Sequence, residues 1–248
     1  MKIGIITAMP GETQAIVRAL QHAEKNRVGE CVVYRSQSSR HEILVAESGM
    51  GFANATTAAR QLIGELRPDL IISAGFCGGI SPELRVGDAV LAIGLTIVSE
   101  NGLQEVPAAV APVSGVFAAG QAAEGRRVFA GLFATTTAIM QKGRLLARLP
   151  AAAPFPVVEM ESSAIALVAG ENGIPFVGLR TVSDPFDEEL GFSLDEFCDD
   201  RMRIRIPRVL LTVARKPRII PQLIRLARNS RVAAASLSET FKRLLAVV

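Results

Sequence analysis

The sequence has few of the residues on which metal sites, disulfide frameworks and histidine-based catalysis depend. Its two histidines, His22 and His41, are widely separated, which argues against a His-rich metal site and against a His-based triad. Its three cysteines form no Cys-x-x-Cys pair, which argues against structural zinc and against a disulfide framework. We therefore expect no metal.

Long apolar runs without charge are also absent. No stretch of about 18 residues could span a membrane, and the N-terminal MKIGIITAMP is typical of a strand rather than a signal peptide. We therefore expect a cytoplasmic protein. With 248 residues and 49% hydrophobic content, the chain can form one well-buried α/β domain with an appended segment.

Acidic residues are nearly absent from the C-terminal segment. Residues 201–248 hold 12 Lys and Arg against one acid, Glu239, whereas residues 1–200 hold 15 basic and 23 acidic residues. This division suggests an anionic partner for the segment. We predict a domain over residues 1–202, whose last part, residues 193–202, resembles a helix, and a basic helical tail over residues 203–248.

The tail contains a basic amphipathic stretch, residues 221–228, with arginines on one side and leucine and isoleucine on the other. Such a stretch can lie on an anionic membrane surface at the inner face, or it can be a surface helix whose arginine stems cover the core. Nucleic acid is disfavoured because Phe241 is the tail's only aromatic residue for stacking. Pro207, Pro217 and Pro221 predict a division into short helices.

Short β-branched runs alternate with helical patterns over the first 200 residues. We expect strands at residues 2–7, 31–36, 41–47, 70–74, 86–98, 128–136, 157–158 and 175–182, and helices at about 13–20, 54–66 and 162–172. This order predicts a three-layer α/β/α domain with a central mixed, twisted sheet. Functional groups in such sheets gather beyond the carboxyl ends of the strands.

Acids and one arginine are concentrated at such ends between Pro156 and Asp187. VEMES at residues 158–162 and LRTVSD at residues 179–184 resemble the nucleoside phosphorylase and nucleosidase superfamily, especially the methylthioadenosine/S-adenosylhomocysteine nucleosidases. The opening KIGIITAMP resembles the same family, and so do a glycine-rich turn expected at residues 75–79 and the LRVGDAV that follows it. The resemblance implies cleavage of a nucleoside's N-glycosidic bond without a cofactor.

The resemblance implies a role for each acid. Glu161 would bind the ribose hydroxyls, Asp184 would protonate the purine, and Glu12 would activate the attacking water. Arg180 would either orient Glu12 by a salt bridge or bind phosphate. The alternatives are that Glu161 caps its helix, Asp184 forms an Asx turn and Glu12 is a first-turn acid favoured by the helix dipole.

Two positions depart from the family pattern. Phe76 stands where a small hydroxyl residue would help to hold water or phosphate, and Ile139 stands where an aromatic residue would stack on the purine. The other expected substrate-binding residues follow from the family positions. They are Met9, Gly75, Met140, Glu159, Met160 and Ser183.

Hydrolysis is favoured over phosphorolysis, because a carboxylate at Glu12 can take a proton from water but would repel a phosphate dianion. Phosphate would be a co-substrate only in a phosphorylase, and Ala15 stands where a phosphorylase would place an arginine. A dinucleotide site at Gly49-x-Gly51 is the weaker alternative because Asn54 replaces the third glycine.

The tail, Phe76 and the aliphatic base pocket together resemble the hopanoid-associated branch of the superfamily. This resemblance implies removal of adenine from an adenosylated hopanoid, a lipid-linked nucleoside, and peripheral contact with a membrane. Homo-oligomers are expected from the superfamily resemblance. A different class remains open, in which a nucleoside-binding or membrane-surface protein has kept the fold and lost turnover.

Overall fold

The computed structural model describes residues 1–20, 22–28, 31–38, 40–107, 109–138, 140–188, 197 and 206–248. The strands are β1 (Lys2–Thr7), β2 (Glu24–Val28), β3 (Cys31–Gln37), β4 (Glu42–Glu47), β5 (Leu70–Gly79), β6 (Ala89–Ser99), β7 (Gly102–Glu105), β8 (Val128–Thr136), β9 (Val157–Glu159) and β10 (Phe176–Asp184). The helices are α1 (Pro10–Ala19), α2 (Phe52–Leu66), α3 (Val113–Ala123), α4 (Lys142–Leu146), α5 (Ser162–Glu171), α6 (Ile206–Arg215), the 3₁₀ turn η2 (Pro217–Ile219) and α7 (Ile220–Leu245).

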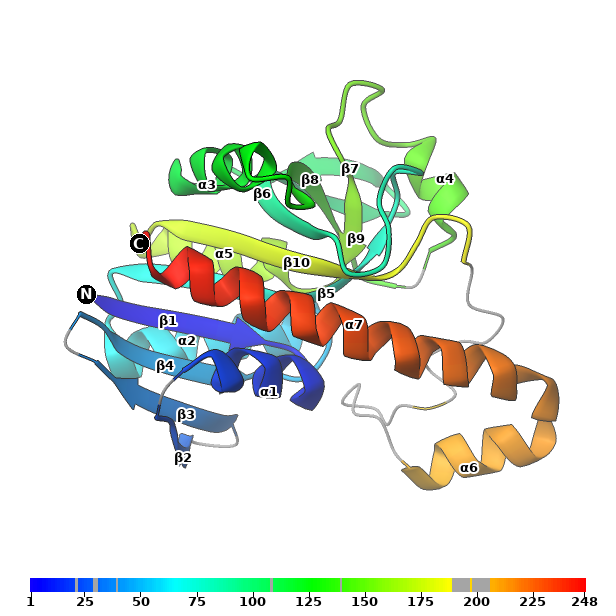
Figure 1. Ribbon diagram of the computed structural model, residues 1–248, viewed down its shortest axis with the longest axis horizontal. Coiled ribbons are helices and arrows are strands. Elements are labelled where there is room, and N and C mark those ends of the chain that lie inside the picture. Colours follow the sequence, from blue (N-terminus) through cyan, green and yellow to red (C-terminus); the bar gives the residue numbers. More distant parts are fainter. Residues whose placement is uncertain are drawn as a thin grey trace.

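One mixed sheet holds these strands in the order β10-β6-β8-β9-β5-β1-β4-β3-β2, with β7 paired to β6 (Figure 1). Strand β5 also pairs with β10, so β5, β10, β6, β8 and β9 form a closed ring. Strands β1, β4, β5 and β10 pair in parallel, whereas β2, β3 and β4 pair antiparallel. The predicted mixed sheet is confirmed.

Helices cover both faces of the sheet. Apolar side chains of α2 and α5 pack into one core cluster, and those of α1, α3 and α7 pack into another. Strands β5 and β10 are buried along almost their whole length, as expected for strands covered on both faces. This arrangement confirms the three-layer α/β/α fold.

The glycine-rich stretch at residues 75–79 is part of β5, so the predicted turn there is wrong. The strand continues because β10 pairs beside it, with Arg180 opposite Gly75, and because β9 pairs with Gly78 and Gly79. The following strand, β6, begins at Ala89 rather than at residue 86, because Gly87 turns the chain with a φ of 89°.

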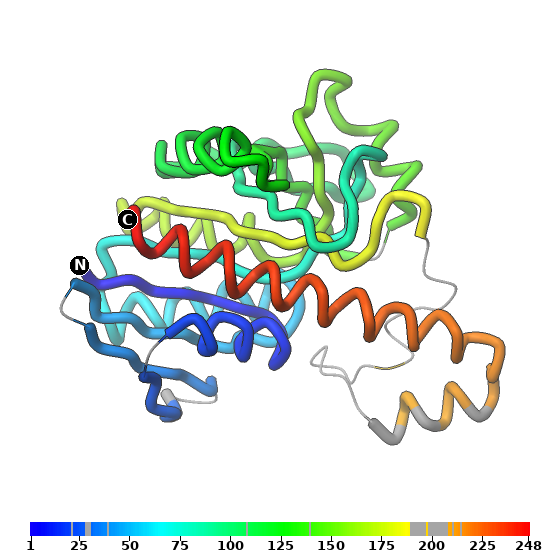
Figure 2. The backbone as a smooth tube through the Cα atoms, in the orientation of Figure 1, coloured from blue at the N-terminus to red at the C-terminus, as the bar shows by residue number. Residues whose placement is uncertain are grey.

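The tail differs from its predicted division into short helices. Pro221 lies in the first turn of α7, where no backbone donor is needed, so α7 runs on for 26 residues. Figure 2 shows α7 passing along the sheet, with its C-terminal end near the N-terminus. Leu237, Phe241 and Leu244 are fully buried against the domain.

The helix predicted over residues 193–202 and the boundary predicted after residue 202 lie outside the described residues. Within the part of the chain that the structure describes, none of the helices is both long and apolar enough to cross a bilayer.

Candidate active site

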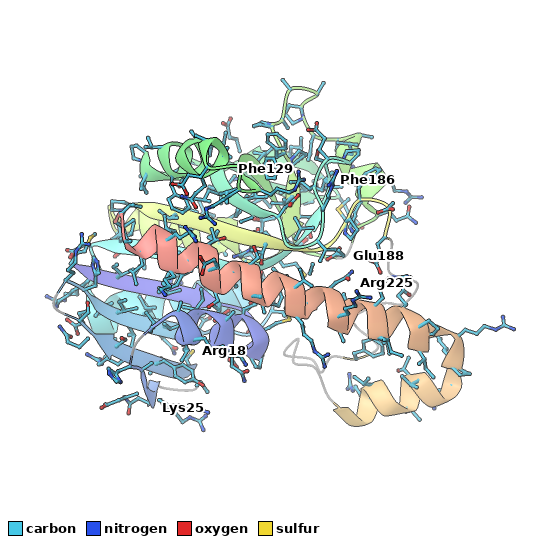
Figure 3. The ribbon with its side chains drawn as sticks, in the orientation of Figure 1. Arg18, Lys25, Phe129, Phe186, Glu188 and Arg225 are labelled. Carbon is cyan, nitrogen blue, oxygen red and sulfur yellow. The ribbon has the colours of Figure 1, made fainter. Side chains whose placement is uncertain are left out.

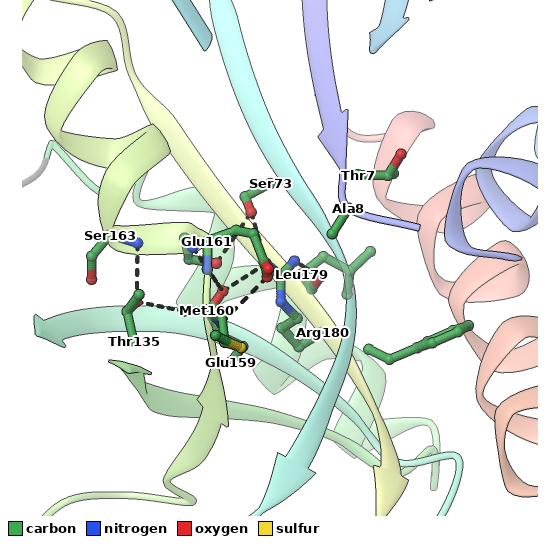
Figure 4. Close-up of polar contacts among 12 residues, drawn as sticks. Thr7, Ala8, Ser73, Thr135, Glu159, Met160, Glu161, Ser163, Leu179 and Arg180 are labelled. Carbon is green, nitrogen blue, oxygen red and sulfur yellow. Dashed lines mark hydrogen bonds and ion pairs between the residues drawn. The ribbon is translucent and has the colours of Figure 1, made fainter. Parts of the chain in front are cut away.

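The carboxyl ends of the strands bring together most of the predicted catalytic residues. Glu12 comes from the first turn of α1 and Arg180 from β10. Glu159 ends β9, and Glu161 immediately precedes α5 (Figure 4). Asp184 is the last residue of β10. All five are buried or largely buried.

Glu159 and Arg180 form the ion pair at the centre of this group, with 2.7 Å between Oε2 and Nη2. The same Oε2 accepts hydrogen bonds from the backbone N–H groups of Glu161 and Ser162, and Oε1 accepts one from the Thr135 hydroxyl. Burial alone would raise the pKa of Glu159, but Arg180 and these donors lower it below its ordinary value. Both Glu159 oxygens are therefore bonded within the protein.

The predicted salt bridge between Arg180 and Glu12 is wrong. Among the described residues, Arg180 forms ion pairs with Glu159 and, at 3.7 Å, with Glu161, and its Nη2 also donates to the Ser73 hydroxyl. Glu159 ends β9 with its Oε2 at Nη2 of Arg180, whereas both Glu12 oxygens are turned to backbone N–H groups. Arg180 acts on Glu12 only by its charge, which lowers the pKa of Glu12.

Backbone N–H groups hold the Glu12 carboxylate. Oε2 accepts from Ala8 and Met9 at 2.8 and 2.9 Å, and Oε1 accepts from Phe76 at 2.7 Å. A Cβ on Gly75 would lie 2.6 Å from Oε1, so any larger residue would displace the carboxylate from this position. Burial raises the pKa of Glu12 above its ordinary value despite Arg180 and these three donors.

Glu161 stands at the N-cap position of α5, but its side chain does not cap that helix. Its Oε1 instead accepts a hydrogen bond of 2.8 Å from the N–H of Gly51, at the start of α2. Burial and the neighbouring Glu159 raise the pKa of Glu161 to about 7, against the lowering effect of Arg180. Glu161 can therefore change its charge near neutral pH.

Asp184 has polar contacts on both carboxylate oxygens. Oδ1 accepts from the Ser183 hydroxyl at 2.8 Å, and Oδ2 lies 2.7 Å from Nζ of Lys142. Burial raises the pKa of Asp184, while Lys142 and Ser183 lower it. The net direction is upward, which favours the protonated form that an acid needs.

The remaining predicted residues occupy different places. Met9 and Met160 are half-buried beside the acids, and Met140 packs against the small core cluster that contains Ile80. Phe76 is half-buried and packs on the cluster that contains α1 and α7. Ile139 lies outside the described residues.

Sequence reasoning missed Thr135 and Lys142, which bind site acids, and Ser73, whose hydroxyl accepts a hydrogen bond from Arg180. Thr135 lies near the end of a predicted strand and Ser73 lies within one, so the sequence could have placed both residues in the sheet. Lys142 follows Gln141 in a stretch without a motif, and its partner Asp184 is 42 residues away. Among the described residues, no group of three His, Cys, Asp or Glu side chains is placed to hold a metal ion.

The sheet, its two helical layers and the buried carboxylates define an enzyme of the nucleosidase and nucleoside phosphorylase type. The chain belongs to the phosphorylase superfamily, whose family model matches residues 2–215. It is 30% identical over 210 residues to the 5'-methylthioadenosine/S-adenosylhomocysteine nucleosidase of Actinobacillus succinogenes, covering 79% of this chain and 91% of that protein.

Solved structures share the fold at lower sequence identity. The 5'-methylthioadenosine/S-adenosyl homocysteine nucleosidase of Helicobacter pylori superposes with a TM-score of 0.75 at 18% identity, covering 100% of this chain and 99% of that one. Futalosine hydrolase of the same organism superposes with a TM-score of 0.74 at 18% identity, covering 100% of this chain and 98% of that one.

Proposed function

We propose that the protein hydrolyses the N-glycosidic bond of an adenine nucleoside. The observation that carries this proposal is a set of three buried carboxyl groups with raised pKa, Glu12, Glu161 and Asp184, beside an ion pair of Glu159 and Arg180. Acid, base and sugar-binding groups are the three carboxyl functions that this reaction requires.

In this mechanism the bond between ribose C1′ and the base nitrogen breaks, and its electron pair leaves with the base. Asp184 gives a proton to purine N7 and so neutralises the departing base. Glu161 accepts hydrogen bonds from the ribose hydroxyls and favours the cationic sugar. Glu12 takes a proton from the water that attacks C1′, while Met160 forms an apolar wall of the sugar site.

Two contacts support water over phosphate as the acceptor. The N–H of Phe76 donates to Glu12, and Nη2 of Arg180 donates to Glu159 and Ser73, although Nε of Arg180 is buried without a hydrogen-bond partner among the described residues. Phosphate would need such donors free, and the Glu12 carboxylate would repel it. Hydrolysis requires only that Glu12 reach a water molecule.

For the substrate we propose a 5′-substituted adenosine with an apolar substituent, such as an adenosylated hopanoid. The half-buried Phe76 and the aliphatic Met9 and Met140 support an apolar site. Methylthioadenosine and S-adenosylhomocysteine, which the relatives are named for, are the alternative substrates.

The test is adenine release, measured by chromatography, from adenosine, methylthioadenosine and an adenosylated hopanoid, each with and without phosphate. Hydrolysis predicts equal release in both conditions, and the hopanoid should have the highest kcat/KM. Strict phosphate dependence would reassign Arg180 to phosphate and contradict the role of Glu12. Nucleoside binding by calorimetry without any product would instead favour a non-catalytic binding protein.

We also propose that the first part of the tail contacts an anionic membrane. Leu211, Ile220 and Ile224 are 40–64% exposed, on helices that carry arginines and no acids in their first turns. Ile224→Asp should reduce sedimentation with anionic liposomes several-fold. Val116→Asp, at an exposed position of α3, is the matched control, and an equal loss in both variants would contradict a specific contact.

Homo-oligomerisation is also part of the proposal. Light scattering on the purified protein should give a dimer or larger assembly, and a monomer at working concentration would contradict it.

A further inference from the structure

Lys142 is a buried cation that the mechanism above does not use. It is the first residue of the short helix α4, which Leu145 anchors in the core, and its side chain is 6% exposed. Nζ lies 2.7 Å from Oδ2 of Asp184 and donates to the carbonyls of Asp184, Pro185 and Glu188 at 3.0, 2.6 and 3.0 Å. Lys142 therefore binds both the side chain and the backbone at the end of β10.

The same segment is held from its other side by α7. Arg225 Nε and Asn229 Nδ2 donate to the two carboxylate oxygens of Glu188, at 2.5 and 3.1 Å. Figure 3 labels Glu188, in the segment that follows β10, and Arg225, which belongs to α7. Residues 184–188 are thus bound by Lys142 from α4 and by Arg225 from α7.

Close packing against β5 also restricts the position of the Asp184 side chain. A Cβ on Gly78 of β5 would lie 2.8 Å from Oδ2 of Asp184 and 3.1 Å from Cε of Lys142. Among the residues that the structure describes, the charged and titratable groups that act on Asp184 are Lys142 from α4, Glu188 from its own segment and the buried thiol of Cys77 from β5. Lys142 is the cation among them.

We propose that Lys142 is a positioning residue for protonation of the leaving base, because it holds the Asp184 carboxyl in place and pairs with the carboxylate that forms. This inference rests on the proposed function, since it assumes that Asp184 is the acid. When the glycosidic bond breaks, its electron pair moves to the base and the Asp184 proton moves to N7. Asp184 is left as an anion, which the Lys142 ammonium stabilises without transferring a proton itself.

The test compares two leaving groups in Lys142→Met, Lys142→Arg and the control Arg144→Met, which removes an exposed charge from the same helix. Adenine must be protonated as it leaves, whereas 4-nitrophenolate leaves from 4-nitrophenyl riboside without an acid. Lys142→Met should slow adenine release about tenfold or more and leave 4-nitrophenol release within about twofold. Lys142→Arg should recover most of the loss, and Arg144→Met should resemble the wild type.

The pH profile gives a second readout. Loss of the ammonium makes Asp184 a weaker acid, so the alkaline limb of adenine release should move to higher pH in Lys142→Met. An equal loss for both leaving groups, or an unmoved alkaline limb, would overturn the proposal.

Failure of the proposed function is distinguishable from failure of this inference. If the wild type cleaves neither substrate, the proposed function fails. The pairing is then read from ¹³C NMR titration of the Asp184 carboxyl, assigned with Asp184→Asn. Its pKa should rise in Lys142→Met, and an unchanged pKa would overturn the pairing.

Discussion

Two acid–cation pairs in the site have the same separation, but the pKa of the acid is shifted in opposite directions. Glu159 with Arg180 and Asp184 with Lys142 are both paired at 2.7 Å. The pKa of Glu159 is nevertheless lowered, whereas that of Asp184 is raised. Burial opposes ionisation in both, so the cation alone does not decide the direction.

The difference lies in the hydrogen-bond donors around each carboxylate. Glu159 receives two backbone N–H groups and the Thr135 hydroxyl in addition to Arg180, whereas Asp184 receives the Ser183 hydroxyl in addition to Lys142. The Lys142 ammonium also donates hydrogen bonds to three backbone carbonyls, so it interacts less exclusively with Asp184. A buried carboxylate with many hydrogen-bond donors stays ionised and stabilises the fold. One with fewer donors can hold a proton and transfer it in the reaction.

Breaking the Glu159 pair should have the largest effect. Glu159→Gln would keep a carbonyl oxygen for the backbone N–H groups but would remove the negative charge that neutralises the buried Arg180. The free energy of unfolding should fall by about 3–5 kcal/mol, measured by urea denaturation. Glu171→Gln, in an exposed pair with Arg60 at 3.9 Å, should leave the midpoint unchanged. Similar midpoints for both variants would refute the anchoring role.

The raised pKa of Glu161 predicts that the stability of the protein depends on pH. This pKa rises from 4.5 to about 7 on folding, so the folded state holds this proton more tightly than the unfolded state. The stabilisation is present below pH 4.5 and is lost as the pH rises through about 7. Over this window the wild type should lose on the order of 3 kcal/mol relative to Glu161→Gln.

Thermal melts of both proteins at several pH values between those limits test this expectation. Asp184 titrates in both proteins, so its contribution cancels in the difference, whereas Glu12, whose charge raises the pKa of Glu161, contributes to it. A difference that does not change with pH would show that Glu161 keeps an ordinary pKa.

Gly75→Ala should displace Glu12 while leaving both ion pairs in place. The new methyl group would lie 2.6 Å from Oε1 of Glu12, so adenine release should fall about 100-fold. Gly64→Ala is the matched control, because open space surrounds that position on α2 and alanine should stabilise the helix by about 0.5–1 kcal/mol. Equal activity of the two variants would argue against a role for Glu12.

Arg225→Ala should have the smallest effect. The arginine is 57% exposed, so loss of its bond to Glu188 should cost about 1 kcal/mol or less, measured by urea denaturation. High salt should reduce the difference from the wild type further. A loss as large as that in Glu159→Gln would mean that α7 holds the Asp184 segment as firmly as Arg180 holds Glu159.

Much of the fold could be predicted because local patterns agree with it. The strands predicted at residues 2–7 and 128–136 are confirmed as β1 and β8, since apolar runs bounded by turn residues specify both ends. The position of the acids at strand ends also followed from the βαβ order. In contrast, the continuation of β5 through its glycines depends on pairing with β9 and β10, which no local signal shows.

The pairing of charged residues could not be predicted in the same way. Three acids compete for Arg180, and the sequence does not show that Glu12 is already satisfied by three backbone donors. Lys142 meets Asp184 only because α4 packs beside the end of β10. Long-range packing, rather than any motif, determines these contacts.

The most direct measurement is adenine release by Asp184→Asn, together with nucleoside binding by calorimetry. An amide cannot give up a proton to N7, so release should fall about 10²–10⁴-fold while binding is retained. Wild-type release by Asp184→Asn with intact binding would contradict the assignment of Asp184 as the acid.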